Sequence, residues 1–101
     1  METNTATPLT VIAHVHAKPG QQARLLAEQL KLVAAARQHP GCLRYELHRS
    51  DTEQGLVIFV ETWTSAAQWR DHLDSSYMAA FRNAAGECIA QTSIYEMRAV
   101  A

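Results

Sequence analysis

The sequence predicts an α+β fold of the ferredoxin-like type, in which an antiparallel sheet carries its helices on one face. Two observations lead to this class. Segments at 9–17, 42–50, 56–64 and 88–97 alternate or concentrate apolar residues as β-strands do. Helical patterns follow the first strand and the third, so the order is β-α-β-β-α(α)-β. Right-handed crossovers then place the helices on the same side of the sheet.

The composition is that of a single globular domain. The chain has 101 residues, of which 48% are hydrophobic, and a formal net charge of −1 with neither sign concentrated. We expect one domain over residues 9–101, preceded by a flexible polar tail over residues 1–8. The sequence shows no basic region for nucleic acid or an anionic membrane. The longest apolar run, residues 56–60, is too short to span a membrane, and the first residues do not resemble a signal peptide, so we expect a cytoplasmic protein.

The first strand and the first helix are separated by Lys18-Pro19-Gly20, where Pro19 is well placed to begin a helix. Alternation along residues 9–17 predicts two faces, one formed by Leu9, Val11, Ala13 and Val15 and the other by Thr10, Ile12, His14 and His16. The helix covers residues 21–38 and ends at His39-Pro40-Gly41. Apolar spacings of three and four predict its buried stripe as Ala23, Leu26, Ala27, Leu30, Val33 and Ala34.

The strand over residues 42–50 has two predicted sides, one with Leu43, Tyr45 and Leu47 and the other with Arg44, Glu46 and His48. A turn at 51–55 joins it to the next strand as a hairpin. Ser65 with Gln68 resembles a capping box, which predicts a short helix through Trp69 and Leu73. Residues 74–76 cap a second short helix over 77–85, Gly86 closes it, and the last strand begins at 88.

The strand at 56–60 is apolar on both of its faces, because Leu56, Ile58 and Val60 alternate with Val57 and Phe59. Helices that cover one face of the sheet leave the other face open to water. A second copy of the same sheet is the simplest cover for that face. The sequence therefore predicts a homodimer.

The segment Glu61-Thr62-Trp63 with His72 holds the main candidates for chemistry. It places a carboxylate and a large aromatic residue at the end of an apolar strand. A carboxylate is costly to bury unless it has a partner. We therefore expect this segment to form one wall of a pocket.

Two interpretations are open for each ionisable residue. His72 follows Trp69 by three residues, hence on the same helix face. There it can act as a general base near neutral pH, or it can simply bond to a backbone carbonyl. Glu61 can orient such a histidine, or it can pair with an arginine such as Arg44 or Arg98.

Bulky side chains cluster around this segment, namely Trp63, Trp69, Tyr77, Met78 and Phe81. At helical spacing such residues usually belong to the core. They also form a flat slot that suits a planar aromatic ligand. Tyr45, on the neighbouring strand, would add a hydroxyl group to that slot.

Other motifs give little support for further chemistry. His14 and His16 share a strand face but lack a clear third metal ligand, so a structural role at the sheet–sheet contact is favoured and no metal is expected. The chain has no GxGxxG, no phosphate loop and no GxSxG motif. Cys42 and Cys88 lack CxxC spacing, and we expect small buried residues at strand starts rather than a redox pair.

Several short motifs occur in a characteristic order: Leu9-Thr-Val-Ile-Ala13 leading to Lys18-Pro19-Gly20, Pro40-Gly41-Cys42-x-x-Tyr45, Glu61-x-Trp63 and His72-Leu73. Together they resemble the antibiotic biosynthesis monooxygenase domain, and within it the small bacterial quinol monooxygenases. The resemblance covers residues 9 to 98. It implies a homodimeric α/β barrel built from two ferredoxin-like subunits, in agreement with the dimer expected from the strand at 56–60.

The resemblance also implies a reaction without metal, flavin or another cofactor. Its substrates would be dioxygen and a small electron-rich aromatic, such as a quinol or a polyketide-like phenol. Because this substrate supplies the electrons, the protein need only desolvate, orient and deprotonate it. His72 is then the expected catalytic base and Glu61 its partner. The expected substrate-binding residues are Tyr45, Trp63, Trp69, Tyr77, Met78 and Phe81.

The chain departs from one branch of this superfamily. The haem-degrading branch has an Asn, a Trp and a haem-ligating His where this sequence has Val15, His72 and Arg82, so haem degradation is disfavoured. Two alternatives stay open. One is a non-catalytic dimeric module for small-molecule binding or stress response. The other is an isomerase-type enzyme for a phosphorylated signalling sugar, which would need a concentrated basic pocket.

Overall fold

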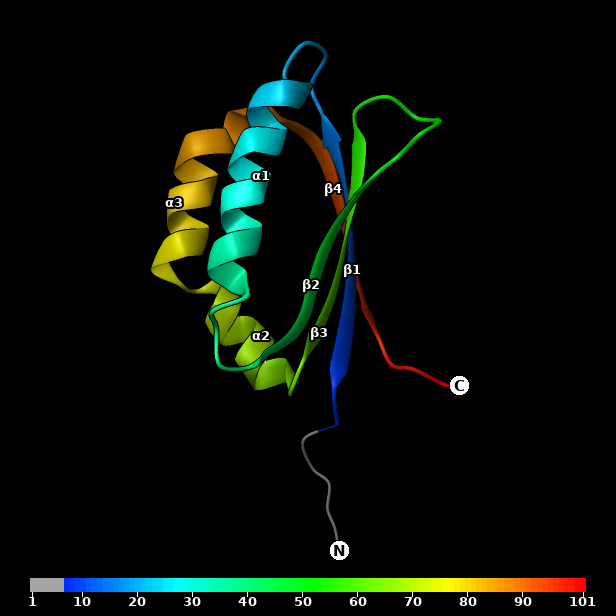
Figure 1. Ribbon diagram of the computed structural model, residues 1–101, viewed down its shortest axis with the longest axis vertical. Helices are drawn as coiled ribbons and strands as arrows, with labels where there is room; N and C mark the ends of the chain where they lie inside the picture. Colours follow the sequence, from blue (N-terminus) through cyan, green and yellow to red (C-terminus); the bar gives the residue numbers. More distant parts are fainter. Residues whose placement is uncertain (1–6) are drawn as a thin grey trace, which may run out of the picture.

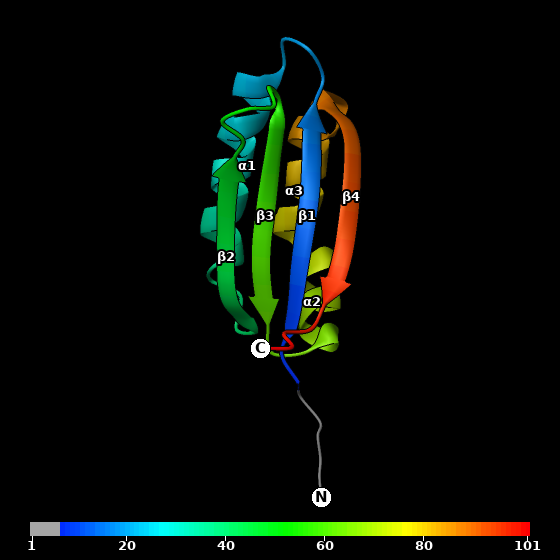
Figure 2. The same cartoon turned by 90° about the vertical axis from the view of Figure 1, so that its right-hand side faces the viewer.

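The computed structural model describes residues 7–101, and residues 1–6 of the predicted tail lie outside the described residues. The elements are β1 (Leu9–Ala17), α1 (Gln22–Ala36), β2 (Cys42–Arg49), β3 (Leu56–Trp63), α2 (Ala66–Leu73), α3 (Ser76–Ala85), the 3₁₀ turn η1 (Gly86–Cys88) and β4 (Ile89–Met97). They form an antiparallel sheet of order β2-β3-β1-β4. Within residues 7–101 all three helices lie on one face of it (Figure 1, Figure 2). The predicted ferredoxin-like α+β fold is confirmed.

None of the helices in residues 7–101 has the length and apolar character needed to cross a membrane.

Alternation along β3 decides which side chains meet the helices. Val57, Phe59, Glu61 and Trp63 are buried, whereas Leu56, Ile58, Val60 and Thr62 are half-buried on the face without helices. The register extends this division across the sheet, because Val11 pairs with Glu61 and Ile12 with Val60. The predicted faces of β1 are also observed: Leu9, Val11, Ala13 and Val15 are all buried. One face of the sheet, here called the inner face, therefore packs on the helices, and the outer face does not.

The buried stripe of α1 differs from the predicted stripe. The residues of α1 that are buried are Leu25, Gln29, Leu32, Val33 and Ala36. Only Val33 belongs to the predicted set, and Leu30 is 57% exposed. Apolar spacing is misleading here because the stripe that the fold buries contains the polar Gln29. The helix also begins at Gln22, so Pro19 lies in the preceding turn rather than in the helix.

Strand β2 departs from simple alternation at its start. A register shift between Cys42 and Arg44 leaves Leu43 58% exposed, so the prediction that Leu43 shares the face of Tyr45 is wrong. Tyr45 is buried as expected. Cys42 is half-buried and Cys88 is buried, and both thiols are free. Cys88 lies in η1 rather than at the start of the last strand.

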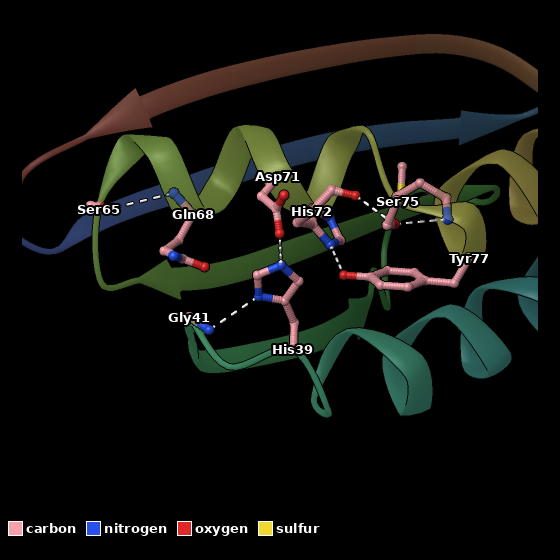
Figure 3. Close-up of polar contacts among 9 residues, drawn as sticks. His39, Gly41, Ser65, Gln68, Asp71, His72, Ser75 and Tyr77 are labelled. Carbon is pink, nitrogen blue, oxygen red and sulfur yellow. Dashed lines mark hydrogen bonds and ion pairs between the residues drawn. The ribbon is translucent and has the colours of Figure 1, made fainter.

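Both short helices begin at serine caps. The hydroxyl of Ser65 accepts a hydrogen bond from the backbone N–H of Gln68, as the capping-box pattern predicts. Ser75 accepts in the same way from the N–H of Met78 and so begins α3 (Figure 3). Each cap satisfies a backbone donor that the helix itself leaves unpaired.

The turn between α1 and β2 is tied to α2 (Figure 3). His39 bonds through Nε2 to a carboxylate oxygen of Asp71 over 2.8 Å, and its Nδ1 accepts the backbone N–H of Gly41 at 3.1 Å. Because Nδ1 is an acceptor, the ring proton lies on Nε2 and is donated to Asp71. These bonds position α2, and with it the cavity-lining His72.

We predict that Gly41→Ala destabilises the fold, because a Cβ at this position would lie 2.5 Å from the Cβ of Gln68. Neither atom can move without a backbone shift, so we expect a loss of about 1–3 kcal/mol in the free energy of unfolding, measured by urea denaturation. Gly86→Ala is the matched control, since a Cβ there meets no atom within 4 Å. Equal unfolding midpoints for the two variants would contradict this packing.

Candidate functional site

A cavity of about 240 Å³ lies between the inner face of the sheet and the three helices. Each helix contributes to it, through Leu32 on α1, Trp69 on α2 and Phe81 on α3. The walls are mainly apolar, and the ionisable groups among the lining residues are Glu61, His72, Arg82 and the phenol of Tyr45. Apolar walls with a few converging polar groups are characteristic of small-molecule sites.

Glu61 is a buried carboxyl group without a cationic partner among residues 7–101. It is 5% exposed, and the indole N–H of Trp63 donates to its Oε1 over 2.9 Å. Burial raises the pKa of Glu61 from 4.5 to about 7, and the hydrogen bond from Trp63 offsets part of that rise. Near neutral pH this group therefore exchanges its proton readily.

The arginine partners predicted for Glu61 have other contacts. Arg44 pairs with Glu46 on the outer face, and Arg98 donates to backbone carbonyls just before β1. The arginine-pairing interpretation is therefore wrong for these two residues. Among the described residues Glu61 also makes no hydrogen bond to His72. Glu61 reaches the cavity from β3, and His72 reaches it from α2.

His72 is 1% exposed, and among residues 7–101 its ring is bonded to a side chain, not to a backbone carbonyl. Its Nδ1 lies 2.5 Å from the hydroxyl oxygen of Tyr77 (Figure 3). Burial, followed by the electrostatic influence of His39 and of the Arg82 guanidinium, lowers the pKa of His72 from 6.5 to about 4. Burial also raises the pKa of Tyr77, so its hydroxyl stays protonated and donates to Nδ1. The neutral imidazole then carries its own proton on Nε2.

The predicted substrate-binding residues divide into two groups. Those that line the cavity are Tyr45, Trp69, Met78 and Phe81. Trp63 and Tyr77 lie behind this lining and bond to Glu61 and His72, respectively. The ring centroids of Trp63 and His72 are 4.5 Å apart, so the indole ring also packs against the imidazole and helps to hold it in place. Two residues expected to touch a ligand therefore hold ionisable groups in place.

Two parts of the cavity were not predicted from the sequence, namely the wall formed by β4 and the cation Arg82. Thr92 and Ile94 of β4 line the cavity, and so does Arg82 of α3. Pairing of Ile94 with Ala13 places it on the inner face, which only the sheet register reveals. The position of Arg82 could have been predicted from the sequence, since it follows Met78 by four residues and therefore lies on the same face of the helix. Its guanidinium donates to the backbone carbonyl of Leu73 over 2.7 Å.

His14 and His16 have separate partners beside the outer face. The ring of His14 packs edge-to-face on Tyr95, with centroids 5.5 Å apart. Nε2 of His16 bonds to Glu53 over 2.7 Å. In the part of the chain that the structure describes, no group of three or more His, Cys, Asp or Glu side chains is arranged to hold a metal ion.

The arrangement has a definite chemical capacity. A flat apolar molecule can lie between Tyr45, Trp69 and Phe81, which would exclude water from it. The carboxyl group of Glu61 can accept a proton from a ligand hydroxyl near neutral pH. The neutral ring of His72 can donate a hydrogen bond to a ligand oxygen.

Solved structures of other proteins are similar over almost the whole chain. The protein PA3566 of Pseudomonas aeruginosa has a TM-score of 0.90 and 29% identity, over 98% of this chain and 100% of that one. A Caulobacter crescentus protein, described as a candidate antibiotic biosynthesis monooxygenase, has a TM-score of 0.88 and 30% identity, over 95% and 92% of the two chains. A third, described as an antibiotic biosynthesis monooxygenase, has a TM-score of 0.86 and 28% identity, over 92% and 99%.

A curated relative and a family model agree with these structures. The uncharacterized Synechocystis protein sll1783 is 26% identical over 74 residues, which are 73% of this chain and 50% of that protein. This chain thus spans about half the length of that relative. The model of the antibiotic biosynthesis monooxygenase family matches residues 8–84, which include Glu61 and His72. The chain therefore belongs to the antibiotic biosynthesis monooxygenase family.

Proposed function

We propose that this protein is a monooxygenase that oxidises a small electron-rich aromatic compound, a quinol or polyketide-like phenol, with dioxygen and without metal or flavin. The observation that carries the proposal is the aromatic-walled cavity lined by both Glu61 and His72. Membership of the family supports monooxygenase chemistry in general. The choice of a phenolic substrate rests on the flat apolar walls and on the proton acceptor beside them.

Glu61 is the better base of the pair, in place of the His72 expected from the sequence. A general base works best when its pKa lies near the operating pH. The pKa of Glu61 is about 7, whereas the pKa of His72 is about 4, which leaves the imidazole little affinity for a proton. The carboxylate oxygen of Glu61 that does not accept from Trp63 takes the phenolic proton.

His72 stabilises the negative charge that deprotonation creates. With Tyr77 bonded to Nδ1, the Nε2–H of His72 donates to the phenolate oxygen or to the reduced dioxygen. The ring is held by Tyr77 on one side and by contact with Trp63. This support keeps the donor oriented before the substrate arrives.

The reaction balances with the substrate and dioxygen alone. A ring carbon that carries hydrogen, ortho or para to the phenolate oxygen (ortho in a quinol), bonds to dioxygen, and the protonated Glu61 returns its proton to the resulting peroxide. The hydroperoxide then loses water, formed from its outer O–H and the hydrogen on the ring carbon. One oxygen atom becomes the new quinone carbonyl and the other leaves as water. All the electrons come from the substrate, so no reductant is required.

We further propose that the protein acts as a homodimer joined through the outer face. The half-buried Ile12, Ile58 and Val60 and the half-exposed Tyr95 present an apolar surface there. At the β2 edge Arg44, Glu46 and His48 form a hydrogen-bonded row of both charges. A two-fold axis pairs such a surface with itself, so apolar and opposite-charge groups meet. Both cavities stay on the helix side, away from this contact.

The two alternatives have less support. An isomerase for a phosphorylated sugar would need several cations in the cavity. Among residues 7–101 the lining contains one cation, Arg82, and that group already bonds to a backbone carbonyl. A non-catalytic binding module would use the same cavity, and it differs from the proposed enzyme only in forming no product.

We predict oxygen uptake with a panel of quinols, measured with an oxygen electrode, and one labelled atom in the quinone product when labelled dioxygen is supplied. His72→Ala should lower kcat/KM by about 10²- to 10³-fold, because one preorganised donor is lost. His16→Ala, which is not among the lining residues and contacts Glu53 instead, is the control. Uptake no faster than the uncatalysed reaction, or equal rates in His72→Ala, would refute the proposal. Thermal stabilisation by planar aromatics without product would favour the binding module.

We predict that kcat/KM of the wild type rises with pH through an apparent pKa near 7, as Glu61 ionises. The Glu61→Gln variant should have a low kcat/KM that does not rise with pH, although its side-chain oxygen can still accept the hydrogen bond from Trp63.

The same variant should also differ from the wild type in stability. Because burial raises the pKa of Glu61, the folded protein keeps a proton that the unfolded chain has already released, so stability falls as pH rises from about 4.5 to about 7.

Glu61→Gln should not show this loss of stability. At pH 8 its free energy of unfolding, measured by urea denaturation, should exceed that of the wild type by about 2–3 kcal/mol, with little difference near pH 4. Asp51→Asn, exposed in the hairpin turn, is the control and should change neither profile. If Glu61→Gln is less stable than the wild type at pH 8, burial of the ionised Glu61 carboxylate does not destabilise the fold, and the prediction is wrong.

We predict that Val60→Glu converts the dimer to a folded monomer, because it places a charge at the centre of the apolar outer face. Light scattering after size exclusion at micromolar concentration measures the mass, and circular dichroism checks the fold. Leu30→Glu, on the exposed side of α1, should remain a dimer. A monomeric wild type at the same concentration would remove the dimer proposal.

A further inference from the structure

A second cavity lies near the hairpin end of the molecule, where β2 turns into β3 (top of Figure 1). It has a volume of about 250 Å³ and lies between the first half of α1 and the β2–β3 hairpin. Its lining residues are all different from those of the cavity that contains Glu61. Its apolar walls include Leu25, Leu26 and Val57, and its polar groups include Gln29 and Arg49.

Gln29 is the first unusual feature of this cavity. Its side chain is 1% exposed on the buried face of α1, and its amide Nε2 has no hydrogen-bond partner among the described residues. Buried polar groups in folded proteins almost always have a partner, so an unpaired donor calls for a specific explanation. The same residue breaks the apolar pattern of α1. Positions where a sequence departs from local rules are often positions that serve function.

Arg49 is the second polar group of this cavity, and it lies at an exposed position of the lining. Within residues 7–101 it makes no hydrogen bond or ion pair, whereas Arg44 on the same strand pairs with Glu46. Its guanidinium offers several donors in a planar fork, which suits a carboxylate. In the part of the chain that the structure describes, the cavity lining contains no Asp or Glu that would compete for this group.

We propose that this cavity is a second ligand site, which binds a small monocarboxylate with an apolar body. The carboxylate oxygens would accept from Nε2 of Gln29 and from the guanidinium of Arg49. The apolar body would pack on Leu25, Leu26 and Val57. The volume is just below the range of about 300–1,000 Å³ for sites of drug-sized ligands, so a compact chain such as octanoate suits it.

Octanoate titrated into the full-length protein at pH 7, followed by amide NMR shifts, tests the proposal. We expect saturable shifts that map to the first half of α1 and to the end of β2. Octanol, which has the same chain without the charge, should bind at least tenfold more weakly. Shifts that map instead to Trp69 and Phe81 would assign the ligand to the first cavity and overturn the proposal. So would equal binding of octanol, or no saturation at millimolar octanoate.

Two variants test the roles of the donors. Arg49→Gln removes the charge at an exposed position and should weaken octanoate at least tenfold without changing the melting temperature. Gln29→Leu should weaken octanoate as well and should raise the melting temperature, because it removes an unpaired buried amide. Arg70→Gln, which changes an exposed arginine on α2, is the control and should bind octanoate as the wild type does. Unchanged affinity in Arg49→Gln and Gln29→Leu would refute the site.

Discussion

The strict alternation of β3 beneath a single layer of helices is the constraint on which the rest of the structure depends. Its inward side chains, Val57, Phe59, Glu61 and Trp63, supply both the centre of the core and the carboxyl group of the cavity. A slip of one residue would move all of them to the outer face. Pairing with β1 on one side and β2 on the other holds the register. Core and candidate site therefore share one strand and cannot vary independently.

Burial has opposite electrostatic effects on the two ionisable groups of the cavity. It raises the pKa of Glu61 and lowers the pKa of His72, so each group is driven toward its neutral form. The pair therefore offers a carboxyl group that can accept a proton near neutral pH and a neutral imidazole that can donate a hydrogen bond. Such divergence of neighbouring pKa values is a feature of catalytic sites. The hydrogen bonds from Trp63 and Tyr77 orient Glu61 and His72, respectively, without adding charge.

Local chemistry made much of the fold predictable. The strand pattern of residues 9–17, the hairpin turn and the serine cap of α2 each depend on neighbouring residues, and each was predicted correctly. The buried face of α1 was not, because two stripes have helical spacing and the packed one contains Gln29. Leu43 was misplaced for a similar reason, since a bulge in β2 is a property of strand pairing.

By itself, the sequence determined the order of elements, the one-sided helix layer and the family, because these depend on periodicity and short motifs. It also identified Glu61 and His72 as residues of interest. Only the tertiary structure decided that Trp63 and Tyr77 support these groups rather than line the cavity, and that β4 forms a wall. Those facts depend on contacts between residues far apart in the chain, which strand register and helix packing create.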